Sequence, residues 1–394
     1  MKEIYSNINI IGGGLIGLVS ACSLSSLGYK VTILEKNPHY KLNQKNKDFR
    51  TTAISEGTKK FLDTIKLWKS IKTFAEPIKK INIVDRKKSN QLQFDNNRRS
   101  SNLGYIVENK ILIDIFYKHL ENNKNVKVFN NTEILNINNL NDAVLTKTQK
   151  FNHISDLNIA ADGKKGFVKK FLKTPFFYKE YKKKALVIIC KHSKNHFGTA
   201  FELFYKNGPL AILPMKKKGL NYLSSIVWTN ETKYIDDLIN LDNIRLMSIL
   251  NEATQLSVGN INTIINKQTF SLSAHLNNSF YEKRTIYVGD SAHSFHPIAG
   301  QGWNLGMNDV KNLYYLSKKY LSLGIEVGDK HFCKQFHNEN FYNAYRLFQI
   351  TDKLDTIFQI QNPFFSLGRS VGLDYIQKNT KIKNKISDFA MGVN

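Results

Sequence analysis

Three spaced glycines near the start of the chain constrain its fold more than any other feature. Gly12, Gly14 and Gly17 form a Gly-x-Gly-x-x-Gly pattern between a short apolar run, residues 7–11, and an apolar helical pattern. A second strand-like run, residues 31–36, follows after one helix length. This strand–turn–helix–strand order predicts a βαβ unit, and therefore a parallel sheet, at the start of the chain.

Each glycine has a physical role if the turn binds a phosphate. Gly12 permits a tight turn, Gly14 lets a pyrophosphate approach the backbone, and Gly17 allows the helix to pack closely on the strand. The helix start offers free N–H groups and a partial positive charge. Glu35 stands 18 residues after Gly17, where a carboxylate can accept hydrogen bonds from a ribose diol. The pattern predicts an adenine dinucleotide, NAD(P) or FAD, with an unliganded glycine-rich turn as the alternative.

A second glycine-and-acid site favours the longer of these cofactors. In the stretch "YVGDSAHSFHPIAGQGWNLGMNDV", Gly289 and Asp290 follow a strand-like run, and Gly300-Gln301-Gly302 opens a helix. A carboxylate on such a loop can bind a sugar-alcohol hydroxyl. The helix start can stabilise negative charge at the pyrimidine end of a flavin. Two anchors that are distant in the sequence predict an elongated FAD.

The same stretch raises the alternative of a metal site. Asp290, His293 and His296 recur every three residues, a spacing that would put three ligands on one face of a helix. Pro297 and the preceding strand argue against a regular helix there, and no His-Glu-x-x-His pattern accompanies the three residues. We expect no metal, and we expect both histidines to fix the loop more than to act as acid–base catalysts.

The charge of the chain allows an acidic partner without requiring one. Lys+Arg is 57 and Asp+Glu is 32, which gives a net charge of +25, and eight of the 57 basic residues are arginine. Scattered lysines are typical of codon bias towards A and T; attraction to a membrane surface is the alternative. No nucleic-acid-binding module is recognisable, so we expect no nucleic-acid partner.

Cysteine usage and hydropathy predict where the protein works. Cys22, Cys190 and Cys333 are odd in number and widely spaced, which argues against a disulfide framework and fits a reducing cytoplasm. No run approaches about 18 uninterrupted apolar residues, so we expect no transmembrane helix. We therefore predict a cytoplasmic protein, with a peripheral position on the inner face of the cell membrane left open.

The order of strand-like and helical patterns predicts a discontinuous domain organisation. After residue 175 the alternation of strands and helices gives way to antiparallel-looking strands, with a hairpin signal at Asn207-Gly208. The expected fold is an α/β, Rossmann-type FAD-binding domain with an inserted, mostly antiparallel β-sheet and C-terminal helices. The expected segments are 1–75, 100–175 and 271–335 for the FAD-binding domain, 76–99 and 176–270 for the substrate domain, and 336–394 for a helical region packed on the FAD domain.

With these motifs in hand, the chain resembles the class A FAD-dependent aromatic hydroxylases, which have a para-hydroxybenzoate-hydroxylase-like fold. Within that class it resembles the ubiquinone-biosynthesis hydroxylases that act on polyprenylated phenols. The resemblance spans almost the whole length and rests on "IIGGGLIGLVSACSLSSLGYKVTILEK", "DFRTTAIS", "LGYIVENKILIDIF", "AADG", "GPLAILPM", "GDSAHSFHPIAGQGWNLGMNDV" and "TDKLDTIF". Gly166 and Lys169 depart from the family, which usually has a serine and an arginine there.

The resemblance implies a cofactor site assembled from five of these stretches, whereas "GPLAILPM" matches a hairpin of the substrate domain. It names no catalytic acid or base, and it makes Pro297, Gly300, Gln301 and Gly302 a flavin-facing loop. The implied cofactor-binding residues are Gly12, Gly14, Leu15, Ile16, Gly17, Glu35, Lys36, Arg50, Asn109, Asp162, Gly163, Gly289, Asp290, Pro297, Gly300, Gln301, Gly302, Trp303 and Asn304.

The resemblance also implies a reaction. NAD(P)H would reduce FAD, reduced flavin and molecular oxygen would give a C4a-hydroperoxide, and an electron-rich polyprenylphenol would take its distal oxygen. The protein must then hold the ring in an apolar pocket that excludes water. Two alternatives stay open: a flavin-dependent reductase of isoprenoid double bonds, and a catalytically weak scaffold subunit of a quinone-biosynthesis complex. Ring position, tail length, NADH against NADPH, association with other ubiquinone-biosynthesis proteins and homo-oligomerisation are not fixed by the sequence.

Overall fold

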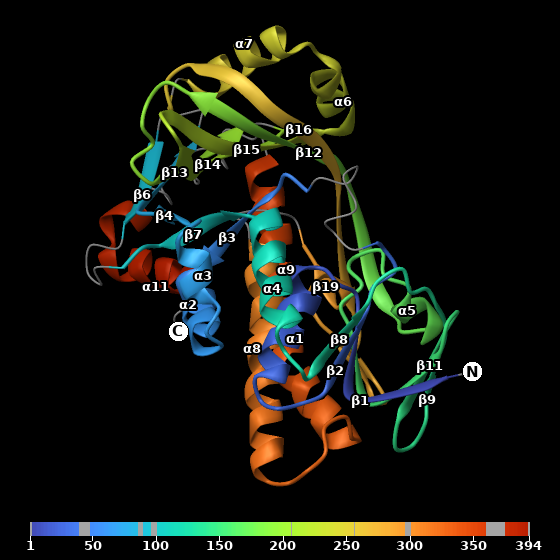
Figure 1. Cartoon of the computed structure of the whole chain (residues 1–394). Helices are drawn as coiled ribbons and strands as arrows, with labels where there is room; N and C mark the ends of the chain where they lie inside the picture. The colour runs from blue at the N-terminus through green and yellow to red at the C-terminus, as the bar shows by residue number, and fades with distance from the viewer. Residues whose placement is uncertain are drawn as a thin grey trace.

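The structure is a computed structural model, and its strands form three sheets (Figure 1). The predicted architecture, an α/β dinucleotide-binding sheet with an inserted, mostly antiparallel sheet and C-terminal helices, is confirmed. The structure describes residues 2–38, 48–85, 90–95, 101–205, 207–255, 257–295, 301–359 and 375–392.

The first sheet carries the predicted βαβ unit at its centre, with α1 (Leu15–Ser25) between its first two strands. Its strand order is β17-β18-β11-β1-β2-β8, with β10 paired to β11 and β9 paired to β10, and the run from β18 to β8 is parallel. Ile8, Ile10 and Ile11 are buried, as expected for a parallel strand that is covered on both faces. The strands are β1 (Glu3–Ile11), β2 (Val31–Leu34), β8 (Val126–Phe129), β9 (Ile134–Asn139), β10 (Val144–Thr148), β11 (Asn152–Ala160), β17 (Tyr281–Glu282) and β18 (Thr285–Tyr287).

The register of this sheet brings the ends of four parallel strands to one edge. Ile11 of β1 pairs with Ala160 of β11 and with Leu34 of β2, and Ala160 pairs with Tyr287 of β18. The glycine and acid motifs predicted to bind a cofactor in these segments each begin within two residues of one of these four strand ends. Ligands of α/β sheets bind outside the carboxyl ends of the strands, so the topology places the motifs where a cofactor would bind.

The second sheet is the predicted insertion, and it lies at the top of Figure 1. Its order is β19-β16-β12-β15-β14-β13-β5-β6, and its pairs are antiparallel except β13 with β5. Helices α6 (Thr232–Asn240) and α7 (Asn243–Thr254) cover its outer face, where Ile235 and Leu246 pack with Leu186, Ile188 and Leu203. The strands are β5 (Lys80–Asp85), β6 (Asn90–Asp95), β12 (Phe176–His192), β13 (Thr199–Tyr205), β14 (Gly208–Lys218), β15 (Asn221–Glu231), β16 (Ile261–Asn277) and β19 (His293–Ser294).

A third sheet supports the inner face of the second. Its order is β3 (Thr51–Ser55), β7 (Gly104–Glu108), β4 (Glu76–Ile78). Ile78 and Ile106 of this sheet share one apolar cluster with Ile189, Met215 and Leu223 of the second sheet. The remaining helical segments are α2 (Glu56–Thr64), α3 (Trp68–Lys72), α4 (Asn109–Glu121), α5 (Val168–Phe171), the 3-10 turn η1 (Gly289–Ser291), α8 (Gln301–Ser322), α9 (Lys330–Gln359) and α11 (Thr380–Met391).

The expected domain boundaries lie close to changes of sheet, although the division itself stays a prediction. β12 begins at Phe176, and β5 and β6 join the second sheet. β4, expected in the substrate domain, pairs with β7 of the third sheet. α9 continues across residue 335, and Met391 packs in the cluster between the second and third sheets. The C-terminal region therefore reaches the inserted sheet as well as the FAD-binding domain.

Two further observations concern the environment of the chain. Cys22, Cys190 and Cys333 are free and buried. Within the ranges that the structure describes, no helix combines the length and the apolar character that crossing a membrane requires.

Buried and exposed positions of the second sheet should respond differently to truncation. Ile188 is fully buried under α6 and α7, whereas Ile265 of the same sheet is 42% exposed. Because Ile188→Ala removes buried methyl and methylene groups and leaves a cavity, we expect the free energy of unfolding to fall by about 2–5 kcal/mol. The control Ile265→Ala should change it by less than about 0.5 kcal/mol. Urea titrations measure both values, and equal losses would contradict the assigned packing.

Candidate cofactor site

The turn between β1 and α1 combines close packing with open space. Gly12 has a φ of 112°, and a Cβ there would lie 2.4 Å from the Ala161 carbonyl oxygen; a Cβ on Gly17 would lie 2.0 Å from the Gly12 oxygen. A Cβ on Gly14 would meet no atom within 4 Å. Gly14 is the N-cap of α1, and no side chain caps this helix. Gly12 and Gly17 are therefore required by the packing, while Gly14 leaves room beside uncapped N–H groups, as a phosphate needs.

Glu35 is held beside this turn by backbone groups. Its Oε2 accepts a hydrogen bond from the Gly13 N–H at 2.6 Å. Its Oε1 accepts from the backbone and side-chain amides of Asn37 at 2.7 and 2.8 Å. The carboxylate is thus fixed at the end of β2, where a ribose contact is predicted, and Lys36 is exposed next to it.

The second glycine-and-acid turn touches the first through one side chain. Gly289 has a φ of 57°, and a Cβ there would lie 2.9 Å from Ile16 Cγ1. A Cβ on Gly306 of α8 would lie 2.9 Å from Ile16 Cδ1 and 3.1 Å from the Gly289 Cα. Ile16 therefore fills the space between two glycines. The start of α1, the Gly289 turn and α8 meet there because neither glycine has a side chain.

The Asp162-Gly163 motif joins the same junction. Asp162 Oδ1 accepts a hydrogen bond from Ser291 Oγ at 2.7 Å, and Oδ2 accepts from the Val168 N–H at 2.9 Å. A Cβ on Gly166 would lie 2.1 Å from Asp162 Oδ1. In this arrangement a residue with a Cβ at position 166, such as the family's serine, would require the Asp162 carboxylate to shift.

Lys169, which stands in place of the family's arginine, faces the interior and is 6% exposed. Its Nζ donates to the Lys164 carbonyl at 3.0 Å and lies 4.8 Å from the centroid of the Phe176 ring. Burial lowers the pKa of this ammonium group, and the charge of Asp162 acts in the opposite direction. These contacts make Lys169 a donor that holds the loop after the Asp-Gly motif.

Asp290 remains available to a ligand. Its side chain is exposed, yet protein groups surround it, and burial raises the pKa of the carboxyl while His293, Arg50 and Lys164 oppose the shift. A carboxylate that is accessible but incompletely hydrated is suited to accept hydrogen bonds from a ligand hydroxyl.

His293 fixes the Asp290 turn from behind. Its Nε2 lies 2.7 Å from Asp309 Oδ2, and both side chains are 1% exposed. The same oxygen accepts a hydrogen bond from the Gly289 N–H at 2.9 Å, and Phe295 stacks on the imidazole with ring centroids 5.5 Å apart. These contacts assign His293 a loop-fixing role.

The three-residue spacing does not produce a helical metal-binding face. Asp290 lies in the turn η1, His293 lies in the strand β19, and His296 is outside the described residues. Across the described part of the chain, no group of three His, Cys, Asp or Glu side chains is placed to hold a metal ion.

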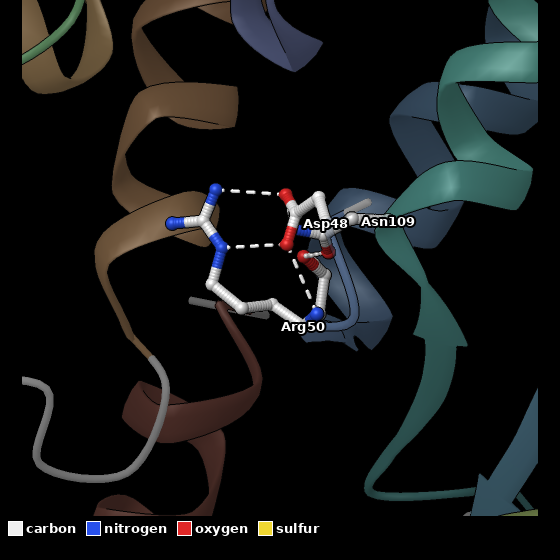
Figure 2. A network of polar contacts seen from close by, with 4 residues as sticks. Asp48, Arg50 and Asn109 are labelled. Carbon is white, nitrogen blue, oxygen red and sulfur yellow. Dashed lines mark hydrogen bonds and ion pairs between the residues drawn. The ribbon is translucent and has the colours of Figure 1, made fainter. Parts of the chain in front are cut away.

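Arg50 approaches the site as part of a polar network (Figure 2). Its Nε and Nη2 donate to Asp48 Oδ1 and Oδ2, both at 2.8 Å, and one guanidinium nitrogen points away from this carboxylate. Asn109 Nδ2 donates to Asp48 Oδ2 at 3.1 Å. Burial alone would raise the pKa of Asp48, but the Arg50 and Asn109 bonds outweigh it and the pKa is lowered. The guanidinium carbon lies 5.1 Å from the centroid of the Phe270 ring, so Arg50 links the third sheet to the second.

Of the four predicted flavin-facing residues, the structure describes the two that lie at the start of α8. Pro297 and Gly300 lie outside the described residues, and α8 begins at Gln301. A Cβ on Gly302 would meet no atom within 4 Å. The buried indole Nε1 of Trp303 has no hydrogen-bond partner among the described residues. A group bound at this helix start would explain both the open space at Gly302 and the unpaired, buried Trp303 donor.

Asn304, also predicted to contact the cofactor, is engaged within the protein. Its Oδ1 accepts from the Ser55 N–H and from Thr58 Oγ1, both at 2.9 Å, and its Nδ2 donates to the Ala53 carbonyl at 2.8 Å. The side chain therefore ties α8 to β3 and the start of α2. The backbone of Asn304 and the second N–H of its amide are left for a direct cofactor contact.

Two contributors to this site were not singled out from the sequence. Asp309 holds both His293 and the Gly289 amide, and Ser291 binds Asp162. The signal for Asp309 is an acidic residue among apolar positions of a helical pattern, where an unpaired carboxylate would be unfavourable. Ser291 carries no comparable signal, because its partner becomes visible only in the folded sheet.

The fold and the site define a flavoprotein that binds an adenine dinucleotide along one sheet edge. A family model described as FAD binding domain matches residues 5–320. The chain belongs to this family.

Relatives and solved structures agree with this assignment along the whole chain. The chain is 26% identical to ubiquinone hydroxylase UbiL of Rhodospirillum rubrum, over 98% of this chain and 90% of that protein. It is 26% identical to the mitochondrial ubiquinone biosynthesis monooxygenase COQ6 of Drosophila melanogaster, with the same shares of 98% and 90%. The fold is similar to p-nitrophenol 4-monooxygenase PnpA from Pseudomonas putida, with a TM-score of 0.82, 16% identity and coverage of 100% and 99%. The predicted class, an FAD-dependent aromatic-ring monooxygenase, is confirmed, and so is the resemblance to the ubiquinone-biosynthesis hydroxylases.

The residues present fit FAD. The amides at the start of α1 would hold the pyrophosphate beside Gly14, and Glu35 would hold the ribose of the adenosine. Asp290 would accept hydrogen bonds from the sugar-alcohol chain, and the open start of α8 at Gly302 would receive the flavin ring.

Substitutions at two glycines of the first turn should separate packing from cofactor binding. Gly17→Ala places a Cβ 2.0 Å from the Gly12 oxygen, so we expect a lower melting temperature even without FAD. Gly14→Ala meets no protein atom within 4 Å. We expect it to keep the melting temperature of the FAD-free protein while weakening FAD binding at least about tenfold, since the methyl group occupies the phosphate approach. Thermal unfolding and fluorescence titration with FAD measure the two effects; unchanged FAD affinity in Gly14→Ala would contradict the site.

Proposed function

We propose that this enzyme hydroxylates the aromatic ring of a polyprenylated phenol in ubiquinone biosynthesis, with NAD(P)H as the reductant and molecular oxygen as the oxidant. The observation that carries the proposal is the position of the apolar inner face of the second sheet beside the FAD site. Arg50 supports this position, because its pKa is raised by its bonds to Asp48 and by the charge of Asp290, and its guanidinium contacts Phe270 of the sheet. A hydrophobic substrate on this face would lie next to the cofactor.

The inner face of the second sheet has the character that a lipid-tailed phenol requires. Ile83, Ala211, Leu213 and Val227 are only partly buried, whereas the apolar residues beneath α6 and α7 are almost fully buried. Partly exposed apolar surface inside a molecule favours an apolar ligand, because covering it is stabilising. The names of the relatives, ubiquinone hydroxylase and ubiquinone biosynthesis monooxygenase, support the same substrate class.

Bound FAD would supply hydride acceptance from NAD(P)H and activation of oxygen. The chain would supply binding, orientation and exclusion of water. The uncapped start of α1 would neutralise phosphate charge, and the 22-residue helix α8 would direct the positive end of its dipole toward the flavin ring. Arg50 adds a fixed positive charge near the same place, held by Asp48. These groups would stabilise negative charge that develops on the ring system.

The transfer of one oxygen atom tests the proposal. Purified FAD-loaded protein is mixed with NADH or NADPH, a phenol with a short isoprenoid chain, and isotopically labelled molecular oxygen. We expect the phenol to stimulate NAD(P)H oxidation and one labelled oxygen atom to appear on the ring by mass spectrometry. A reaction without oxygen serves as the control and should leave the phenol unchanged.

The two alternatives predict different products in the same experiment. A reductase of isoprenoid double bonds would give a product with added hydrogen and no label, also without oxygen. A catalytically weak scaffold subunit would leave the bound flavin oxidised in the presence of NAD(P)H and phenol. Either result would overturn the proposal.

A further inference from the structure

Glu202 lies on the inner face of the second sheet. In a strand, successive side chains point to opposite faces. Phe201 and Leu203, its neighbours in β13, pack with the cluster beneath α6 and α7. Glu202 therefore points away from those helices, toward the face that rests on the third sheet.

The register surrounds this carboxyl with apolar neighbours. Glu202 pairs with Ile83 of β5 on one side and with Ala211 of β14 on the other. Ala211 pairs with Val227 of β15, which pairs with Val187 of β12. Residues paired in register share a face of the sheet, so Glu202 is the polar member of a five-strand apolar row.

Among the described residues, none is a partner of the Glu202 carboxyl. Glu202, Ile83, Ala211 and Val227 are all partly exposed, so the described chain does not fully cover this row. No described residue donates a hydrogen bond to this carboxylate or forms an ion pair with it. Burial raises the pKa of Glu202 to about 7, and no charged group contributes to the shift. A desolvated acid without a partner is unfavourable for folding, and such groups concentrate at functional sites.

We propose that the Glu202 carboxylate accepts a hydrogen bond from the hydroxyl group on the aromatic ring of the substrate. It is a positioning and specificity-determining residue that fixes which edge of the ring faces the flavin. The inference rests on the proposed function, because that function makes a phenol the aromatic ring that binds at this site. A hydrogen bond to a charged acceptor is about twice as strong as a neutral one, so the same contact also raises the electron density of the ring.

Paired ligands test the contact without turnover. FAD-loaded protein is titrated, in the absence of NAD(P)H, with a short-chain prenylphenol and with its methyl ether, which lacks the hydroxyl donor. Flavin absorbance reports the dissociation constants. We expect the native protein to bind the phenol at least about tenfold more tightly than the ether, and Glu202→Ala to bind both with similar affinity.

Two variants separate this role from a structural one. Glu202→Gln keeps an acceptor oxygen and should keep part of the preference for the phenol. Glu180→Gln alters an exposed acid of β12 and should keep all of it. If Glu202→Ala retains the native ratio while the native protein still hydroxylates the phenol, the inference fails and the proposed function stands. If the native protein binds neither ligand and adds no oxygen, both fail.

Stability against pH reports whether the acid is desolvated. With a folded pKa near 7, above the ordinary 4.5, the folded state binds more protons between these values. The contribution of Glu202 to the stability of the FAD-free protein should therefore fall as the pH rises through this window. Glu202→Gln removes this loss, so its melting temperature relative to the native protein should be higher at pH 8 than at pH 5. A constant difference between the two proteins would contradict the desolvated carboxyl.

Discussion

The packing of Ile16 between Gly289 and Gly306 is the contact on which the rest of the site depends. It brings the first glycine turn, the Asp290 turn and the start of α8 together at one edge of the first sheet. Neither glycine tolerates a Cβ there without movement, because Ile16 atoms already occupy the position. Two motifs that are remote in the sequence thereby meet at one edge of the sheet, as one cofactor that contacts both would require.

The polar groups of the site divide into those engaged by the protein and those left for a ligand. Asp162 is fixed by a backbone N–H group and by Ser291, and the Asn304 side chain joins α8 to β3. Glu35 is held by backbone N–H groups but stays partly exposed, so its carboxylate can accept a further hydrogen bond from a ligand. Asp290 and the outer nitrogen of Arg50 remain accessible. The engaged groups hold the shape of the site, and the accessible ones mark where a cofactor would make contacts.

The features that could be predicted from the sequence are those that depend on patterns among nearby residues of the chain. The βαβ unit, the insertion of an antiparallel sheet and the roles of Gly12 and Gly17 follow from periodicity and from the sterics of glycine. The partners of Asn304 and Asp309 and the apolar surroundings of Glu202 could not be predicted, because each arises between segments that only the folded sheets bring together. Gly166 illustrates the difference: it departs from the family pattern in sequence, and only the structure shows that it lies against the Asp162 carboxylate.

The central claim is that one FAD molecule extends from the end of β2 to the start of α8. A crystal structure of the protein with bound FAD tests it most directly. The account predicts the adenosine ribose within hydrogen-bond distance of Glu35, the sugar-alcohol chain at Asp290, and the flavin ring between the start of α8 and the inner face of the second sheet. A flavin ring located away from Gly302, or a ribose without contact to Glu35, would contradict it.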